Sequence, residues 1–340
     1  MTRITRGNKP HGKPAQSKVI VQLIPAGFLL LVIVVLFWEK QSMKNSSFGL
    51  IENTGAVFQL KDLTILKSEG DSWQVWNRRQ VLYNSFQCRW LEFKGASGNR
   101  TAKMCAHDKD IISNIINQHG HWPECRQVLQ NYQRQEGVSV THIELGANIG
   151  SCVMELLLET DAEIVAFEPL PKNLFCLTST LLANPHLAAR VTLFPIAVGE
   201  ETSTAYIDAT PQNYGNASLS SNSKGTKMSI ERLDDVISVK PDVSIRSAKI
   251  DVQGFECRVI QGMPNVLSKI KRLSTEVEWD TLLQYGCSDE ELLSLLEHAN
   301  FTLHWQRGKG NLEAIQQRRN LPQQRKVGYV AVGINKKYSK

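Results

Sequence analysis

A short loop holds the residues of this sequence whose types and spacing are best suited to bind a cofactor. Residues 142–150 read HIELGANIG, so Glu144 stands close to Gly146 and Gly150, directly after an apolar run. Glycines in such a loop let the backbone approach a ligand that side chains would keep away. A second acid, Glu168, ends the next apolar run 22 residues after Gly146. An acid at this spacing can accept hydrogen bonds from both hydroxyls of a ribose.

The loop lacks the pattern of a nicotinamide or nucleoside triphosphate site. A dinucleotide-binding loop has the form G-x-G-x-x-G and grips a pyrophosphate, whereas Asn148 stands here at the second glycine position. The loop also has no P-loop lysine. A cofactor with an adenosine but no phosphate fits better, and S-adenosylmethionine (SAM) is such a cofactor. Glu168 would bind its ribose, and Glu144 would bind the amino group of its methionine part, directly or through water. The loop residues expected around it are Gly146, Ala147, Asn148 and Gly150.

A second charged group lies further along the chain, where residues 249–256 read KIDVQGFE. Methyl transfer from SAM needs an acceptor atom aligned with the methyl group and loss of the acceptor's proton. Asp251, at the end of a predicted strand, is the candidate base or acceptor-orienting group, and Lys249 would steer Asp251 or a substrate oxygen. Glu256 opens the next predicted helix, where the helix dipole favours an anion. A catalytic role and a helix-stabilising role are equally open for Glu256.

Two further acids alternate on a later predicted strand. Glu276 and Glu278 point to the same face of that strand, because strand side chains alternate. Glu278 is nearer the carboxyl end, so it could hold the substrate or, together with Asp251, a divalent metal. The sequence offers no third ligand for such an ion. We therefore assign no metal site and leave the use of a divalent metal open.

Alternating strand and helix patterns from residue 138 onward must position these residues. The predicted strands are VSVTHIEL, EIVAFEP, VTLFPIAVG, SAKIDVQ, KRLSTEVEW, FTLHW and VGYVAVGIN. The predicted helices are SCVMELLLE, PKNLFCLTSTLLAN, IERLDDVI, FECRVIQGM and SDEELLSLLEHA. This order predicts an α/β fold with a doubly wound, mostly parallel sheet. Ligands bind at the carboxyl ends of the strands in such a sheet. Segments 208–227 and 306–326 are interpreted as loops.

The same motifs resemble those of FkbM-family methyltransferases over roughly residues 138–305. The similar segments are ELGANIG, AFEP, KNLFCLTSTLLAN, the strand end AVG, LDDVI and, above all, KIDVQGFE. The resemblance implies a SAM-dependent O-methyltransferase with a class I, Rossmann-like fold, and it adds Ala197 of AVG to the expected cofactor site. Glu144 replaces the family's more usual Asp and keeps the charge. Gln253 replaces a Glu, so it receives no acid–base role.

The N-terminal part of the chain has the pattern of a membrane anchor. Residues 19–38, VIVQLIPAGFLLLVIVVLFW, carry no charged side chain and are long enough to cross a bilayer as a helix. Basic residues precede this run at Arg3, Arg6, Lys9, Lys13 and Lys18. By the positive-inside rule they keep residues 1–18 in the cytoplasm. They also account for most of the net charge of +6, which argues against a nucleic-acid-binding face.

We therefore expect a single-pass type II membrane protein whose catalytic domain lies in the lumen of the endoplasmic reticulum or Golgi. Residues 39–60 would form a stem, residues 61–137 an extension of unknown role, and residues 138–340 the FkbM-like methyltransferase domain. N-glycosylation motifs follow the predicted span at Asn45, Asn99, Asn216 and Asn300.

The cysteines support the same compartment. All seven follow the predicted span, and an oxidising lumen would allow some of them to pair. A disulfide is expected among Cys88, Cys105 and Cys125, whereas Cys152 and Cys176 are interpreted as buried thiols. Because the count is odd, at least one cysteine stays free.

The predicted activity is methyl transfer to a hydroxyl, on a sugar or glycan if the domain is lumenal. One alternative is a cytosol-facing methyltransferase of a lipid or small molecule, and another is a non-catalytic binding domain that kept the fold. A transferase that uses nucleoside-diphosphate sugars is disfavoured, because no plausible loop contains a D-x-D motif. The expected partners are the acceptor and the membrane, without nucleic acid.

Overall fold

The computed structural model describes residues 58–59, 63–66, 74–83, 86–133, 141–210, 212–220, 225–306, 311–320 and 328–339. All of them belong to one compact unit, Asn53–Lys340. The predicted tail, the predicted anchor at residues 19–38 and almost all of the predicted stem lie outside these residues. Among the helices of the described residues, none has the length and apolar character needed to cross a bilayer.

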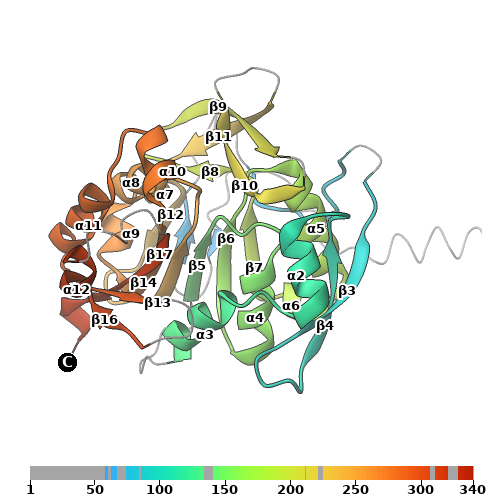
Figure 1. Ribbon diagram of the computed structural model, residues 1–340. Helices are drawn as coiled ribbons and strands as arrows, with labels where there is room; N and C mark the ends of the chain where they lie inside the picture. The colour runs from blue at the N-terminus through green and yellow to red at the C-terminus, as the bar shows by residue number, and fades with distance from the viewer. Residues whose placement is uncertain are drawn as a thin grey trace, which may run out of the picture. The chain divides into compact units, whose positions relative to one another are not determined.

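The central sheet has eight strands in the order β16-β15-β17-β14-β13-β5-β6-β7 (Figure 1). The five parallel strands are β5 (Thr141–Leu145), β6 (Glu163–Phe167), β7 (Val191–Phe194), β13 (Ile245–Ile250) and β14 (Ile270–Val277). At the other edge, antiparallel β17 (Tyr329–Asn335) lies between β14 and β15 (Phe301–Gln306), and β16 (Glu313–Ala314) pairs with β15. The predicted mostly parallel sheet is confirmed.

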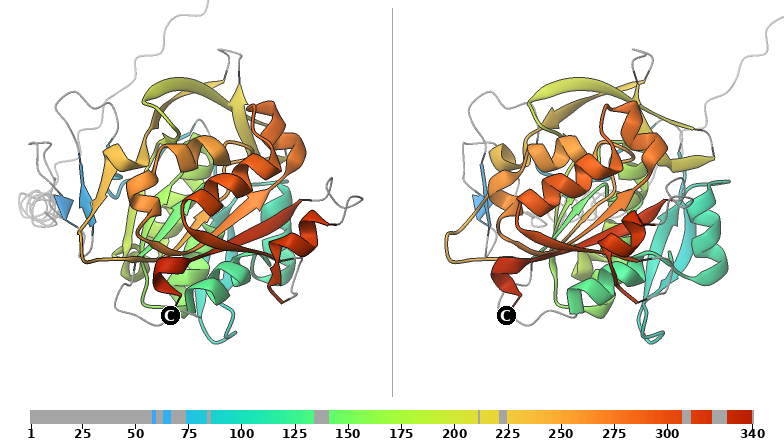
Figure 2. Two further views of the ribbon diagram at one scale, coloured as in Figure 1. Left: turned by 90° about the vertical axis from the view of Figure 1, so that its left-hand side faces the viewer. Right: turned by 60° about the vertical axis from the view of Figure 1, so that its left-hand side comes forward.

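Helices cover both faces of this sheet, which is why β5 is buried along its whole length. One apolar core joins that sheet to helices α4 (Ser151–Glu159), α5 (Pro171–Ala183) and α3 (Cys125–Gln133). The other core contains α8 (Glu256–Gln261), α9 (Pro264–Leu267) and α11 (Asp289–His298). Figure 2, with the left-hand side of Figure 1 turned forward, shows α8, α9 and α11 in front of the sheet.

The helix ends follow local sequence signals. Helix α5 begins with Pro171 in its first turn, where a missing N–H costs nothing. Helix α11 begins after Ser288, whose hydroxyl accepts a hydrogen bond from the N–H of Glu291 at 3.2 Å. The short helices α6 (Pro185–Ala188), α7 (Leu233–Val236) and α10 (Trp279–Gln284) and the 3₁₀ turn η2 (Lys336–Tyr338) connect the larger elements.

Both segments interpreted as loops were predicted wrongly. Residues 203–231 form β9 (Ser203–Thr210), β10 (Asn213–Ser220) and β11 (Thr226–Glu231), which build a second sheet with β8 (Ala197–Val198). Polar and small residues dominate these strands, so their sequence lacks the apolar alternation that would mark them. Within residues 306–326, the structure describes β16 and helix α12 (Ile315–Arg319).

The extension before residue 138 packs onto both faces of the sheet. Strands β1 (Phe58–Gln59) and β2 (Leu63–Ile65) form a small sheet with β12 (Ile237–Val239). Strands β3 (Arg89–Lys94) and β4 (Thr101–Ala106) form a hairpin, followed by helix α2 (Ile111–His119). This hairpin shares its apolar core with α4 and α5.

Disulfides tie the extension to itself and to the sheet domain. Cys88 pairs with Cys105, Cys125 with Cys152, and Cys257 with Cys287. The predicted bridge within the extension is confirmed. Cys152 is not a plain thiol, because helix α3 brings Cys125 against the first turn of α4, a contact between segments 27 residues apart. Cys176 is free and buried, as predicted.

Candidate active site

The glycine loop is held at the carboxyl ends of β5 and β6. The N–H groups of Gly146 and Ala147 both donate to the carbonyl oxygen of Phe167, at 3.0 and 2.9 Å. Gly146 has a φ of +85°, and a Cβ there would lie 1.8 Å from the carbonyl oxygen of Asp251. Only glycine fits this position, because the next loop of the site occupies the space of a side chain.

Glu168 follows β6 and stands 4% exposed at the rim of this loop. Its carboxylate accepts hydrogen bonds from the N–H of Asn148 at 2.7 Å and from the N–H of Leu170 at 2.9 Å. Burial raises the pKa of Glu168 to about 7, although these hydrogen bonds oppose the rise. A carboxyl group with this pKa exchanges between its two protonation states near neutral pH.

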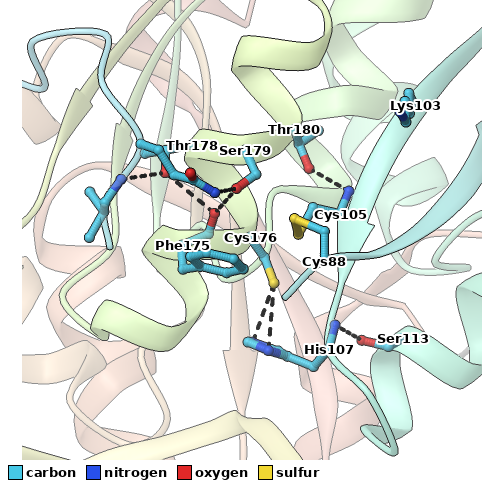
Figure 3. The surroundings of a disulfide bond; sticks show 12 residues. Cys88, Lys103, Cys105, His107, Ser113, Phe175, Cys176, Thr178, Ser179 and Thr180 are labelled. Carbon is cyan, nitrogen blue, oxygen red and sulfur yellow. Dashed lines mark hydrogen bonds between the residues drawn. A yellow bond between two sulfur atoms is a disulfide. The ribbon is translucent and has the colours of Figure 1, made fainter. Parts of the chain in front are cut away.

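Three buried side chains form a series of contacts that leads from Glu168 into the protein interior. The amide nitrogen of Asn173 donates to Glu168 Oε1 at 3.4 Å and to the carbonyl oxygen of Tyr214 at 3.2 Å. Its amide oxygen lies 3.1 Å from Nε2 of His107, and Nδ1 of His107 lies 3.5 Å from the Cys176 thiol (Figure 3). Burial lowers the pKa of His107, so its neutral ring can donate to Asn173 and accept from Cys176.

A first cavity opens beside this carboxylate. Its lining is mostly apolar, with Glu168, Asn148 and Asn173 among its polar members. The apolar walls come from Phe167, Ile196, Val198, Ile207, Met228 and Phe255. Ala197, which the resemblance adds to the expected cofactor site, also lines this cavity. Residues of β10 and β11 close it, so the segment expected to be a loop is a wall of this cavity.

A charged group lies where β5 and β13 end next to each other. Lys249 Nζ lies 2.9 Å from Asp251 Oδ2 and 3.4 Å from Glu144 Oε1. Glu144 Oε2 is also 2.8 Å from Nε2 of His142. Although burial alone would lower it, the carboxylates of Asp251 and Glu144 raise the pKa of Lys249. Lys249 is therefore a fixed cation in this group.

Asp251 also contacts Gln253, which in turn contacts Glu276, and the sequence did not predict this arrangement. Gln253 Nε2 donates to Asp251 Oδ1 at 2.7 Å and to Glu276 Oε2 at 3.0 Å. The negative charge of Asp251, with burial, raises the pKa of Glu276 to about 10. Although burial alone would raise it, Lys249 lowers the pKa of Asp251. At neutral pH Asp251 is therefore ionised and Glu276 protonated.

The structure separates Glu256 from the other predicted catalytic residues. Glu256 is 2% exposed and lines neither cavity of the site. Its Oε1 accepts a hydrogen bond from the N–H of Val252 at 3.0 Å. This carboxyl group holds the turn between β13 and α8, so of its two open roles the geometry favours the stabilising one.

A second cavity lies on the other side of the glycine loop. Its described lining includes Glu144, Lys249, Asp251, Glu276 and Glu278. Trp122, Glu124, Ser151, Cys152, Asn213 and Asn216 also line it. The two cavities share Gly146, Asn148, Gly215, Asp251 and Gln253. A ligand that spans these shared residues would place one end in the apolar cavity and the other in the charged one.

Among the described residues, no third ligand joins Asp251 and Glu278 to hold the divalent metal considered from the sequence. Both carboxylate oxygens of Asp251 are engaged, by Lys249 and by Gln253. Within the described residues, no group of three or more His, Cys, Asp or Glu side chains could hold an ion. His119 ends α2 and His121 follows the helix, and His121 Nδ1 contacts the carbonyl oxygen of His119 at 2.9 Å.

The chain order of the parallel strands reverses between β5 and β13, and the glycine loop lies at this point. This arrangement defines a class I methyltransferase-like α/β fold. Residues 144–303 match the family model described as the methyltransferase FkbM domain. The resemblance carried by the motifs is thus confirmed over this part of the chain, and residues 58–133 of the extension lie outside it. The sequence matches no curated protein.

Solved structures to which the chain is similar include methyltransferase FkbM from Methylobacillus flagellatus KT, with 16% identity, a TM-score of 0.41, and 63% of this chain and 48% of that chain covered. A SAM-dependent O-methyltransferase from Thermotoga maritima has 14% identity and a TM-score of 0.34, with 72% and 77% covered. Phosphoethanolamine N-methyltransferase 2 from Haemonchus contortus, in complex with S-adenosyl-L-methionine, has 8% identity and a TM-score of 0.36, with 64% and 53% covered. The chain spans about half the length of the first and third of these structures.

Proposed function

We propose that this protein is a SAM-dependent O-methyltransferase that methylates a hydroxyl of a sugar or glycan. The observation that carries this proposal is the pair of cavities that meet at Gly146, Asn148 and Asp251. The first cavity is mostly apolar and contains the buried carboxyl group of Glu168, whereas the second contains most of the charged side chains, and Asp251 lines both. This division fits an adenosyl group on one side and an acceptor on the other.

The residues of the first cavity fit an adenosine. Glu168 would accept hydrogen bonds from the ribose hydroxyls, and the apolar walls, with Phe167 and Phe255, would enclose the adenine. Glu144 lines the second cavity, where its carboxylate would face the amino group of the methionine part. Bound across the shared residues, SAM would supply an electrophilic methyl group.

Asp251 is best suited to orient the acceptor hydroxyl and to take up its proton. A carboxylate with a lowered pKa is a weak base. However, a hydroxyl becomes strongly acidic once its oxygen is alkylated, so a weak base suffices at that stage. Lys249 and Gln253 fix the two oxygens of Asp251, which holds the carboxylate in one orientation.

The lining of the second cavity supports a hydroxylated acceptor. Carboxylates of Glu124 and Glu278 and amides of Asn213 and Asn216 lie in this lining. Such groups accept from, and donate to, sugar hydroxyls. A lipid chain would instead need a mostly apolar lining, whereas polar and charged side chains make up most of the described lining here.

We propose further that the catalytic domain faces a lumen of the secretory pathway. The predicted anchor and its charge asymmetry support this topology. Three disulfides among the described residues also suit an oxidising compartment.

Glycosylation tests this topology. Asn99, in the turn between β3 and β4, and Asn300, after α11, are exposed. We expect an endoglycosidase to shift the mobility of the cellular protein, and Asn99→Gln to reduce the shift. A protein without glycans at either site would favour the cytosol-facing alternative.

The activity is tested with the full chain in detergent. We expect calorimetry to show SAM binding by the wild type and by Asp251→Asn. Methyl transfer to a panel of methyl glycosides should fall at least about 100-fold in Asp251→Asn and stay unchanged in Asp280→Asn, whose carboxylate is exposed on α10. A folded protein that binds no SAM would sink the proposal. SAM binding without any turnover would favour the non-catalytic alternative.

A further inference from the structure

We propose that Trp122 and Glu124, which precede the FkbM-matched segment, select the acceptor and favour an uncharged sugar over an anionic one. This inference rests on the proposed function. It assigns a role to the extension, for which the sequence alone indicated none.

These two residues form a compact turn between α2 and α3. Trp122 Nε1 donates to Glu124 Oε2 at 3.2 Å, so the indole and the carboxylate are held side by side. Both line the second cavity. An indole ring gives the C–H face of a sugar an apolar surface, and an adjacent carboxylate accepts hydrogen bonds from its hydroxyls.

A disulfide fixes this turn against the cofactor loop. Cys125 begins α3 directly after Glu124, and it is bonded to Cys152 in the first turn of α4. Cys152 itself lines the second cavity. Trp122 and Glu124 are therefore tied covalently to α4, the helix that follows Gly150, and the bridge sets their distance from the glycine loop.

The charges of the cavity lining oppose an anionic ligand. Lys249 is the cation of the described lining, and Asp251 and Glu144 already pair with it. Glu276 is held protonated by Asp251. Burial raises the pKa of Glu124. Even without its charge, the carboxylates of Asp251, Glu144 and Glu278 outnumber Lys249 in the lining. The lining is therefore negative, and a carboxylate or phosphate on the acceptor would be repelled.

The lining also holds a buried polar atom that points to a ligand. Ser151 is 6% exposed and lines the second cavity, and its Oγ has no hydrogen-bond partner among the described residues. A buried hydroxyl without a partner is unfavourable, because it has lost its hydrogen bonds to water. A hydroxylated ligand or a water molecule in the cavity would satisfy it. Asn213 and Asn216 of β10 supply amides to the same cavity.

The test compares matched pairs of uncharged and anionic sugars as acceptors, such as methyl glucoside with methyl glucuronide and methyl galactoside with methyl galacturonide. We expect the wild type to prefer the uncharged member of each pair. Glu124→Gln should shift the ratio of kcat/KM toward the uronide about fivefold, because one nearby charge is removed. Trp122→Leu should raise KM for the glycoside about tenfold through loss of the aromatic surface. Both variants should keep the wild-type Kd for SAM.

Matched controls are Glu92→Gln and Trp90→Leu, which change exposed residues of β3 that line neither cavity. Variants that bind SAM and behave like these controls would overturn the inference and leave the proposed function standing. A wild type that prefers the uronides, or that binds SAM but takes neither sugar class, would also overturn it. Loss of SAM binding in the wild type would instead contradict the proposed function itself.

Discussion

At the scale of single residues, Gly146 determines whether the two loops of the site can approach each other. Its backbone would bring a Cβ to 1.8 Å from the Asp251 carbonyl oxygen. We therefore expect Gly146→Ala to destabilise the protein by about 3 kcal/mol or more and to abolish SAM binding. Gly98→Ala is the control, because Gly98 has a similar φ of +72° with nothing within 4 Å of its Cβ. That change should cost only about 1 kcal/mol of conformational strain. Equal melting temperatures for the two variants would contradict this account.

Glu168 makes SAM affinity dependent on pH. Its pKa is raised to about 7 by burial, and only the ionised carboxylate is a pure acceptor for both ribose hydroxyls. Between pH 6 and pH 8 the ionised fraction rises about tenfold, so Kd should fall by up to about tenfold. Calorimetry at the two pH values measures this change. In Glu168→Gln the dependence should disappear, and a dependence that persists there would assign it to another group.

At the scale of elements, the hairpin of β9 and β10 closes the first cavity and is attached through Tyr285. The hydroxyl of Tyr285, at the end of α10, accepts a hydrogen bond from the N–H of Leu219 at 3.0 Å. Leu219 belongs to β10 and lines the first cavity.

We expect Tyr285→Phe to weaken SAM binding about fivefold, since a net hydrogen bond is worth about 1 kcal/mol. The ring stays in place against Phe255, with a centroid distance of 5.4 Å, so the cavity walls should keep their shape. Tyr338→Phe, in η2, serves as the control. An unchanged Kd in Tyr285→Phe would show that the hairpin needs no such attachment.

At the scale of the whole molecule, several buried carboxyl groups govern how stability varies with pH. Burial raises the pKa of Glu155, Glu168 and Glu256 to about 7 each. In the unfolded chain these groups ionise near 4.5. Their contribution to stability is complete below that value and is lost as the pH rises through about 7. Because its pKa is lowered in the folded state, His107 destabilises the protein below pH 6.5. This effect opposes that of the carboxyl groups, but it comes from one group against three.

The melting temperature should therefore be higher at pH 5.5 than at pH 8. Glu155→Gln should reduce the difference, because Glu155 is fully buried and lines neither cavity. Glu92→Gln serves as control, because it makes the same substitution at an exposed position. A melting temperature that rises from pH 5.5 to pH 8 would show that other groups dominate.

Most of the central sheet could be predicted from the sequence, because its strands other than β16 and the helices that cover it have strong local patterns. The apolar runs that became β5, β6 and β14, and the helices α4, α5 and α11, start and end close to the expected residues. The second sheet could not be predicted, because β10 is polar and small along its length and is defined by pairing with β9. Likewise, nothing local to Cys125 or Cys152 indicates that they meet.

The sequence by itself determined the fold class, the glycine loop, and the placement of Glu144, Glu168 and Asp251 at strand ends, since these depend on short-range patterns and on the rule for parallel sheets. Only the tertiary structure decided which side chains meet. It brought His107 within reach of Asn173, Glu276 within reach of Gln253, and Trp122 to the second cavity. These contacts join segments that are far apart in the chain. Long-range packing determines these contacts, and no local sequence pattern indicates which distant segments will pack together.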